Sequence, residues 1–240
     1  MNKRFGHYLL YAIGEIILVV LGILIALQVN TWKEEKQAKI YERKILKENL
    51  NQLKEDYLRF QKFKSEIDDA DESLYYLITF LNDTVATTDS LAFHIYRLGI
   101  KNFMVHNKSA YESLKSGGLE RISNDSIRMA LTQLHETYFL GAEIMINDVL
   151  RDRFKSWETN YKSLFLDRFY IDKKGIIKEK SIPPTRELLE EQRFSTLLDE
   201  AFAIISILRN TYQNYLIPSM EKTIKLIEKE LGSSLQKTED

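Results

Sequence analysis

Residues 9–28 read LLYAIGEIILVVLGILIALQ and carry a single charged side chain, that of Glu15. A helix of this length, at 1.5 Å per residue, matches the roughly 30 Å hydrocarbon core of a lipid bilayer. Fourteen Ile, Leu and Val residues lie between Leu9 and Val29. Each favours insertion by about 0.3 to 0.6 kcal/mol, whereas one carboxylate costs about 3 kcal/mol at most. The stretch therefore predicts a transmembrane helix.

The residues that flank this stretch agree with a membrane span. Three aromatic side chains stand where rings prefer the headgroup layer and are the expected interfacial anchors: Tyr8, Tyr11 and Trp32. A cleaved signal peptide is the alternative, but the apolar stretch is longer than a signal-peptide core and no small-residue cleavage site follows it. We therefore expect a short basic tail over residues 1–7 and a transmembrane helix over residues 8–32.

One face of the expected span carries Glu15, Gly22 and Ala26, with Asn30 nearby. Gly22 and Ala26 form a small-x-x-x-small pair, which lets two membrane helices approach closely. This face predicts self-association, with Glu15 as a protonated or hydrogen-bonded packing residue. The alternative is that Glu15 carries protons in an ion-conducting membrane complex.

The composition excludes several classes of protein. Nine Gly and three Pro are too few for a chain with many tight turns, which argues for long helices instead of a β-sandwich or barrel. The absence of Cys excludes disulfides, thiolate nucleophiles and Cys-based metal sites. A net charge of −1, with cations spread along the chain, gives no basic field for nucleic acid.

After the span, the sequence continues without Gly or Pro from Lys33 to Asn82. Apolar residues recur four and three positions apart, which predicts one long helix with a hydrophobic seam. The seam residues are Leu46, Leu50, Leu53, Tyr57 and Phe60, followed by Ile67, Leu74, Ile78 and Leu81. Such a helix fits either a coiled coil or one wall of an antiparallel bundle, and we favour the bundle because later helices can cover it.

Two further long helices are predicted downstream. The first begins at a cap on Ser123 or Asn124 and reaches about Leu166. The second begins at a Thr185 cap, buries apolar residues that include Phe202, kinks or restarts at Pro218 and ends at Gly232. Between the long helices we expect short helices over Ser90–Leu98 and Lys108–Ser116, and a β-hairpin over Phe169–Pro184 that turns at Lys173, Lys174 and Gly175.

These elements predict an all-α fold in which one N-terminal transmembrane helix continues into a long-helix antiparallel bundle with a small β-hairpin insertion. The bundle domain covers residues 33–232, and a polar tail covers residues 233–240. The chain shows no Glu-x-x-His pair, no phosphate loop and no nucleophile motif. His135 with Glu136 and Glu143 is a metal-ligand set only if another helix contributes, and a core-edge histidine is the simpler interpretation. Likewise, the acidic run from Asp68 to Glu72 is typical of a solvated helix face.

The densest local pattern runs from His106 to Leu131, where Gly117 and Gly118 break one helix before the next begins. As structure, it predicts a corner that packs Tyr111, Leu114, Leu119 and Ile122 against the end of the bundle. As function, its polar side chains form a candidate recognition corner made of Ser109, Tyr111, Lys115 and Arg121. The structural interpretation is favoured because such corners need turn residues whether or not they bind anything.

Two stretches, Tyr11–Trp32 and Ser109–Leu131, resemble an uncharacterised family of bacterial single-span membrane proteins that is known as a domain of unknown function. Family members typically carry a longer basic stretch before the span, which implies a cytoplasmic N-terminus and a bundle outside the cytoplasm. Here that stretch is reduced to Asn2, Lys3 and Arg4. A count of Lys and Arg on the two flanks alone favours the opposite orientation. The resemblance implies where the span and the bundle lie relative to the membrane, and it supplies no mechanism.

Together these observations predict a non-enzymatic scaffold, sensor-like or partner-binding protein, anchored in a bacterial inner membrane with its bundle in the periplasm. The expected partners are the lipid bilayer and a second copy of the chain or another membrane protein, with no nucleic acid and no cofactor. The alternative function is a single-span subunit of a proton-coupled or ion-conducting complex that uses Glu15.

Overall fold

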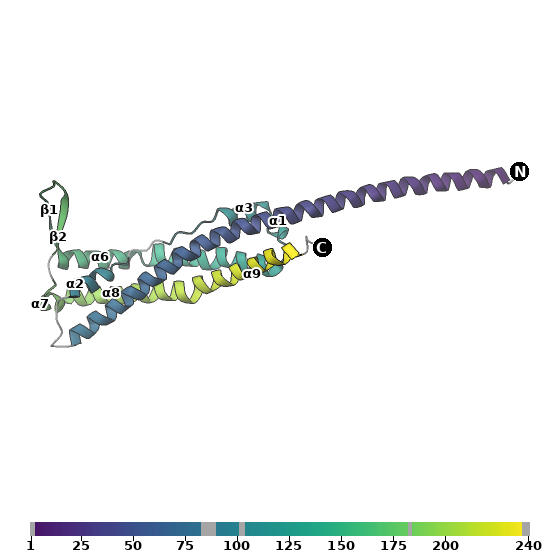
Figure 1. The fold of residues 1–240 in the computed structure, drawn as a ribbon. Helices are drawn as coiled ribbons and strands as arrows, with labels where there is room; N and C mark the ends of the chain where they lie inside the picture. Colours follow the sequence, from purple (N-terminus) through teal and green to yellow (C-terminus); the bar gives the residue numbers. More distant parts are fainter. Residues whose placement is uncertain (1–2, 83–89, 101–103, 182–183, 237–240) are drawn as a thin grey trace.

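The computed structural model describes residues 3–82, 90–100, 104–181 and 184–236 of the chain (Figure 1). Its dominant element is α1 (Lys3–Asn82), an unbroken helix of 80 residues. The N-terminal part of α1 projects alone, and the remainder forms one wall of a helical bundle (Figure 1). Residues of this helix from Ile13 onward include an 18-residue window with a mean hydropathy of 2.3, none of it buried, so α1 is long and apolar enough to cross a membrane.

Two more helical rods complete the bundle beside α1. The second rod consists of α4 (Asp125–Gln133), the π-helix η2 (Leu134–Phe139), α5 (Leu140–Glu143), the π-helix η3 (Ile144–Val149) and α6 (Arg151–Phe165). The third rod consists of α8 (Gln192–Arg209), the π-helix η4 (Asn210–Leu216) and α9 (Ile217–Gln236). Contacts of α1 with α8 and α9, of α6 with α8 and of α4 with α9 join the three rods into an all-α bundle.

The second rod runs parallel to α1, which corrects the antiparallel arrangement expected for it. At one end of the bundle, Ser123 bonds to Glu42 of α1, and Asn124 bonds to Glu230 of α9. At the other end, Phe165 packs against Phe194 at the start of α8. Only the third rod is therefore antiparallel to α1. The physical reason is that the chain returns along the bundle after α1 before it enters α4 (Figure 1).

The return path contains the short elements α2 (Leu91–Arg97), α3 (Ser109–Gly117) and the 3-10 turn η1 (Leu119–Arg121). Gly118, with a φ of 101°, ends α3, and the Asn124 side chain caps α4, as the sequence predicts. In the segment expected to form a hairpin, β1 (Leu166–Ile171) pairs antiparallel with β2 (Ile177–Ser181). Ile182 and Pro183, part of that expected hairpin segment, lie outside the described residues.

Some expected helix boundaries are wrong. Thr185 caps only α7 (Arg186–Leu189), and α8 begins afresh after Glu191 because the chain turns at Glu190. At Pro218 the rod restarts as α9 directly after the π-helix η4, which accommodates a residue without an N–H donor. Within the described chain, Gly232 has no positive φ, so α9 continues through it to Gln236.

The seam of α1 is buried as expected at Leu46, Leu53, Phe60 and Ile67. Further along, Ala70 and Leu77 are buried, whereas Ile78 is 44 % exposed. The expected seam is therefore wrong at Ile78, because the buried face continues from Leu74 by a step of three to Leu77 and leaves the next residue on the outer side. Phe202 is also 61 % exposed, since the neighbouring Ala201 and Ile205 face the core of the bundle instead.

Candidate functional site

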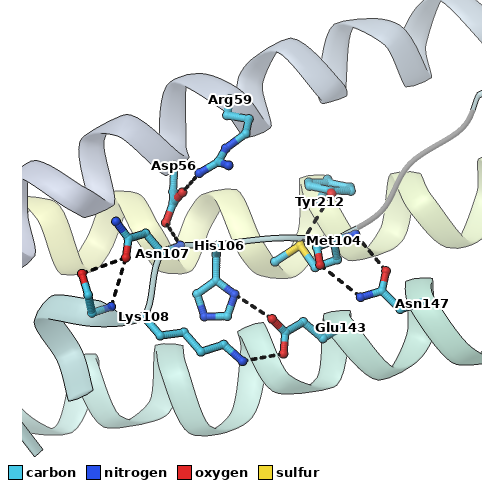
Figure 2. A network of polar contacts seen from close by, with 10 residues as sticks. Asp56, Arg59, Met104, His106, Asn107, Lys108, Glu143, Asn147 and Tyr212 are labelled. Carbon is cyan, nitrogen blue, oxygen red and sulfur yellow. Dashed lines mark hydrogen bonds and ion pairs between the residues drawn. The ribbon is translucent and has the colours of Figure 1, made fainter.

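A short non-helical segment, Met104–Lys108, crosses the interior of the bundle and leads into α3, and we call it the strap (Figure 2). Met104 and His106 are buried, whereas Val105 and Asn107 are exposed. This alternation is typical of an extended chain, in which successive side chains point to opposite sides. The strap therefore inserts two side chains into the core and leaves its own backbone to be satisfied by neighbouring helices.

All three π-helices meet the strap. His135 and Phe139 of η2 contact His106, Asn147 of η3 bonds to Met104, and Tyr212 of η4 bonds to Met104 as well. π-helical turns are rare, and they often occur at functional sites because the extra residue per turn redirects side chains. Their convergence identifies the strap and its surroundings as the candidate functional site.

Polar residues on α1 hold the backbone at the end of the strap and at the start of α3. Asp56 accepts the N–H of Asn107 at 3.0 Å and also bonds to Arg59. One and two turns earlier, Gln52 accepts the N–H of Ala110 at 2.9 Å, and Asn49 donates to the carbonyl of Ala110 at 3.3 Å. Spacings of three and four place Asn49, Gln52 and Asp56 on one helix face. This polar face interrupts the apolar seam and forms hydrogen bonds with the backbone where the strap joins α3.

The beginning of the strap is held from the opposite side (Figure 2). The Asn147 amide accepts the N–H of Met104 and donates to its carbonyl, both at 3.0 Å. The Tyr212 hydroxyl donates to the Met104 sulfur at 3.6 Å. The buried backbone of Met104 is thus satisfied by a side chain, as burial of peptide groups requires.

Glu143 on α5 joins two strap residues. One carboxylate oxygen lies 3.1 Å from Nδ1 of His106, and the other accepts from Nζ of Lys108 at 2.7 Å (Figure 2). His106 itself is 7 % exposed, and the centroids of its ring and the Phe139 ring are 4.0 Å apart. Glu143 therefore couples a buried imidazole to a surface ammonium group.

His135 lies between Tyr111 and His106 in the core of the bundle. Its ring is 9 % exposed, stacks on Tyr111 at a centroid distance of 4.1 Å and an angle of 1°, and lies 5.7 Å from the ring of His106. In the described part of the chain neither ring nitrogen of His135 has a hydrogen-bond partner. A buried polar group without partners is costly, so this side chain has the least favourable polar environment at the site.

The ionisation states follow from this burial. Loss of hydration lowers the pKa of His106 to about 4, although Glu143 opposes the shift. Loss of hydration, with the nearby His106, lowers the pKa of His135 to about 3. Burial raises the pKa of the Asp56 carboxyl, while the bonds from Asn107 and Arg59 partly restrain it. Both imidazoles are therefore neutral at pH 7.

The expected recognition corner is brought together only in part. Tyr111 and Lys115 converge on Glu136, at 3.1 Å and 2.7 Å. Ser109 instead bonds to Asn107 and Gln52, and Arg121 lies over the ring of Tyr41 at 4.8 Å. The apolar residues of the corner are buried or half-buried, as the structural interpretation requires: Tyr111, Leu114, Leu119 and Ile122.

The expected span residues lie on the projecting part of α1. Glu15 and Ala26 are exposed, and a Cβ added at Gly22 meets nothing within 4 Å, so this face is open to a lipid or a second helix. Asn30 donates to Glu34 at 2.8 Å, and Trp32 is 64 % exposed with Lys36 over its ring. The side chains of Tyr8 and Tyr11 lie outside the part of the chain whose side chains are described.

The site has no metal-binding arrangement in the described residues. Glu136 is turned toward Tyr111 and Lys115, and Glu143 toward His106 and Lys108, so His135 does not share a ligand set with either carboxylate. The acidic run on α1 is used in surface contacts, with Asp69 paired to Arg97 and Asp71 to Arg209. These groups hold neighbouring elements together.

Comparison with known proteins gives a family. A family model described as a family of unknown function, DUF6090, matches residues 15–174. The chain belongs to the DUF6090 family. No curated protein and no solved structure matches it. The DUF6090 match includes α1 from Glu15 onward, the strap and the whole second rod, and it ends at the hairpin turn before α8 and η4.

The sequence pattern missed most of the residues that make this site. Asp56 stands four positions before Phe60 on the seam, but Tyr57 was assigned to the seam in its place, although it is half-buried and bonds to Glu221. A polar set at Asn49, Gln52 and Asp56, in phase with buried leucines, is the signal that identifies such a face. No comparable signal marks His106, because its burial depends on helices far along the chain.

Proposed function

We propose that this DUF6090 protein is a non-enzymatic, membrane-anchored scaffold or sensor-like module that binds a partner through its helical bundle. One observation carries the proposal. The helix that contains the exposed apolar segment also supplies Asp56 to the strap and Asn49 and Gln52 to Ala110 at the start of α3, without a break between them. A displacement or rotation of the span is therefore applied directly to the buried network.

Membrane anchoring is supported by the surface of the N-terminal part of α1. Large apolar side chains from Ile13 to Val29 are roughly half exposed or more, and the bundle covers none of them. A contiguous apolar surface of this size is unfavourable in water and marks a contact with a membrane or a protein. A bilayer fits because the apolar residues surround the helix on all sides.

Alkaline carbonate extraction of native membranes tests the anchor. We expect the full-length chain to stay in the membrane pellet. A Leu18→Arg, Leu24→Arg variant is the control, because each arginine costs about 2.5 to 3.5 kcal/mol near the centre of a span and should release the chain. Release of the native chain into the soluble fraction would contradict the proposal.

We further propose a bacterial inner membrane with the bundle, Lys33 to Asp240, on the periplasmic side. Alkaline phosphatase and a fluorescent protein that folds only in the cytoplasm are fused separately to the C-terminus. Phosphatase activity without fluorescence is expected. Fluorescence without phosphatase activity would reverse the orientation and leave the anchor itself intact.

The partner is a second copy of the chain or another membrane protein. The small face at Gly22 and Ala26 supports close helix packing, because neither residue carries a side chain that would keep a second helix away. Co-purification from native membranes, with and without the span variant, identifies a partner that depends on the anchor. The alternative, a proton-coupled or ion-conducting subunit, depends on Glu15 and is tested separately below.

A further inference from the structure

A cavity of about 690 Å³ opens between α1, α2 and α6, away from the strap and its polar network. Its lining combines aromatic and charged side chains, principally Glu66, Asp69, Tyr96, Arg97, Trp157 and Tyr161. Cavities of this size, lined by aromatic groups with a few polar groups, are typical of small-molecule sites. None of these residues takes part in the contacts of the strap.

The aromatic wall of the cavity is built by α6. The rings of Trp157 and Tyr161 stack at a centroid distance of 5.1 Å and an angle of 14°. A Cβ at Gly99 would lie 2.9 Å from the Trp157 ring, so the glycine allows the indole to rest against the chain after α2. Tyr96, 74 % exposed, adds a third ring at the mouth.

The charged groups of the cavity differ in whether they already have a partner. Arg97 is paired with Asp69 and with Glu72. Glu66, by contrast, has no ion-pair or hydrogen-bond partner among the described residues. The cavity therefore offers one unneutralised carboxylate beside aromatic rings.

We propose that this cavity binds a small organic cation, an ammonium group that lies beside the aromatic rings and Glu66. Aromatic faces attract ammonium groups through their quadrupole, and the attraction strengthens where water is excluded. Glu66 adds a full negative charge. An anionic ligand fits less well, because both cations of the lining are already paired, Arg97 with two carboxylates and Lys162 with Glu158.

Trp157 provides a direct readout, because the chain has two tryptophans and the other is Trp32. The full-length Trp32→Phe protein, in a maltoside detergent without choline headgroups, is titrated with choline chloride at constant ionic strength. Choline supplies a quaternary ammonium group. We expect a saturable change in Trp157 fluorescence. Its neutral carbon analogue, 3,3-dimethylbutan-1-ol, should bind at least about fivefold more weakly, which corresponds to about 1 kcal/mol.

Matched variants locate the effect. Glu66→Gln and Tyr96→Leu should each weaken choline binding about fivefold or more, whereas Tyr96→Phe, which keeps the ring, and Glu55→Gln, outside the cavity, should bind like the parent. All three positions are on the surface, and circular dichroism checks that each of the four variants is folded. A response that does not saturate, an equal response to the neutral analogue, or unchanged binding by Glu66→Gln would overturn the proposal.

Discussion

Asp56 accepts the backbone N–H of Asn107 at 3.0 Å, a bond between residues 51 positions apart in the sequence. The Asp56 side chain is 1 % exposed, and Arg59 is its ion-pair partner. The bond therefore ties the strap to the interior face of α1, the helix that also bears the candidate span. A buried carboxylate at a seam position is expensive, which makes its removal informative.

Replacing Asp56 by Leu should destabilise the bundle by about 1 to 3 kcal/mol, although leucine matches the apolar seam. The N–H of Asn107 would be left buried without an acceptor, and that loss outweighs the removal of a buried charge. Asp56→Asn keeps an acceptor oxygen and should cost less than Asp56→Leu. Urea unfolding of the full-length protein, followed by circular dichroism, measures both, with the exposed Glu55→Leu as control. An Asp56→Leu protein as stable as the parent would contradict this role.

The two buried histidines predict a loss of stability in acid. Their pKa values fall from 6.5 to about 4 for His106 and about 3 for His135 on folding. Below about pH 6.5 the unfolded chain binds protons that the folded chain excludes, so the free energy of unfolding falls as the pH falls toward those values. Each histidine contributes up to about 1.4 kcal/mol per pH unit. Above pH 6.5 neither contributes.

Replacing His135 by Phe isolates one of these contributions, because the ring keeps its contact with Tyr111 but cannot bind a proton. Between pH 6 and pH 4 the parent should lose stability more steeply than the variant, as measured by urea unfolding at each pH. The pH dependence of stability from Asp56 has the opposite sign. Because its pKa is raised by folding, its contribution to the free energy of unfolding is present at low pH and is lost as the pH rises through its pKa in the folded protein. This Asp56 contribution is the same in the parent and the variant, so it cancels in the comparison. Equal slopes would show that His135 is not kept neutral by folding.

Alanine substitutions at two glycines, one with a positive φ and one in a helix, test where the fold requires glycine. Gly118 has a φ of 101°, and a Cβ there would also meet the carboxylate of Glu120. Gly118→Ala should therefore destabilise the bundle by about 1 to 2 kcal/mol. Gly141 lies within α5, and a Cβ there meets nothing within 4 Å, so Gly141→Ala should stabilise by about 0.5 to 1 kcal/mol. Thermal unfolding of the two variants should shift in opposite directions, and a shared direction would refute the assignment.

The long helices could be predicted because their signals are local. The spacing of Leu46, Leu53 and Phe60 gives the buried face of α1, and the Asn124 cap gives the start of α4. Rod direction could not be predicted in the same way. The parallel arrangement of α1 and the second rod depends on the return path after α2, whose course is set by tertiary contacts such as the bond between Asn107 and Asp56.

The candidate site could be predicted even less. Its residues come from α1, the strap, η2, α5, η3 and η4, and no short sequence window contains more than a few of them. The sequence did point to His135 and Glu143 together, but as possible metal ligands, whereas each has different partners in the fold. The π-helical turns that bring His135, Asn147 and Tyr212 to the strap have no composition signal of their own.

Self-association through the span predicts a strong effect of side-chain size at Gly22. Replacing Gly22 by Ile should weaken an oligomer by about 1 to 2 kcal/mol or more, because the branched side chain holds the helices apart. The bundle should keep its unfolding transition, since Gly22 lies on the projecting part of α1. Sedimentation in detergent and cross-linking in lipid measure the distribution, and Leu18→Ile serves as a control for the added branching. An unchanged distribution for Gly22→Ile would exclude this face.

Glu15 separates the scaffold from the proton-coupled alternative. If Glu15 carries protons it must ionise during the cycle, so Glu15→Gln, which keeps the shape but cannot titrate, should abolish proton flux in liposomes. If Glu15 only packs, Gln should be tolerated, and Glu15→Leu should weaken assembly by well under 2 kcal/mol, as is typical of single interhelical hydrogen bonds. We expect the second pattern, because no second Asp, Glu, His, Lys or Arg lies between Leu9 and Val29 to continue a proton path. Flux that is present for the native protein, alone or with a co-purified partner, and absent for Glu15→Gln would establish the alternative function.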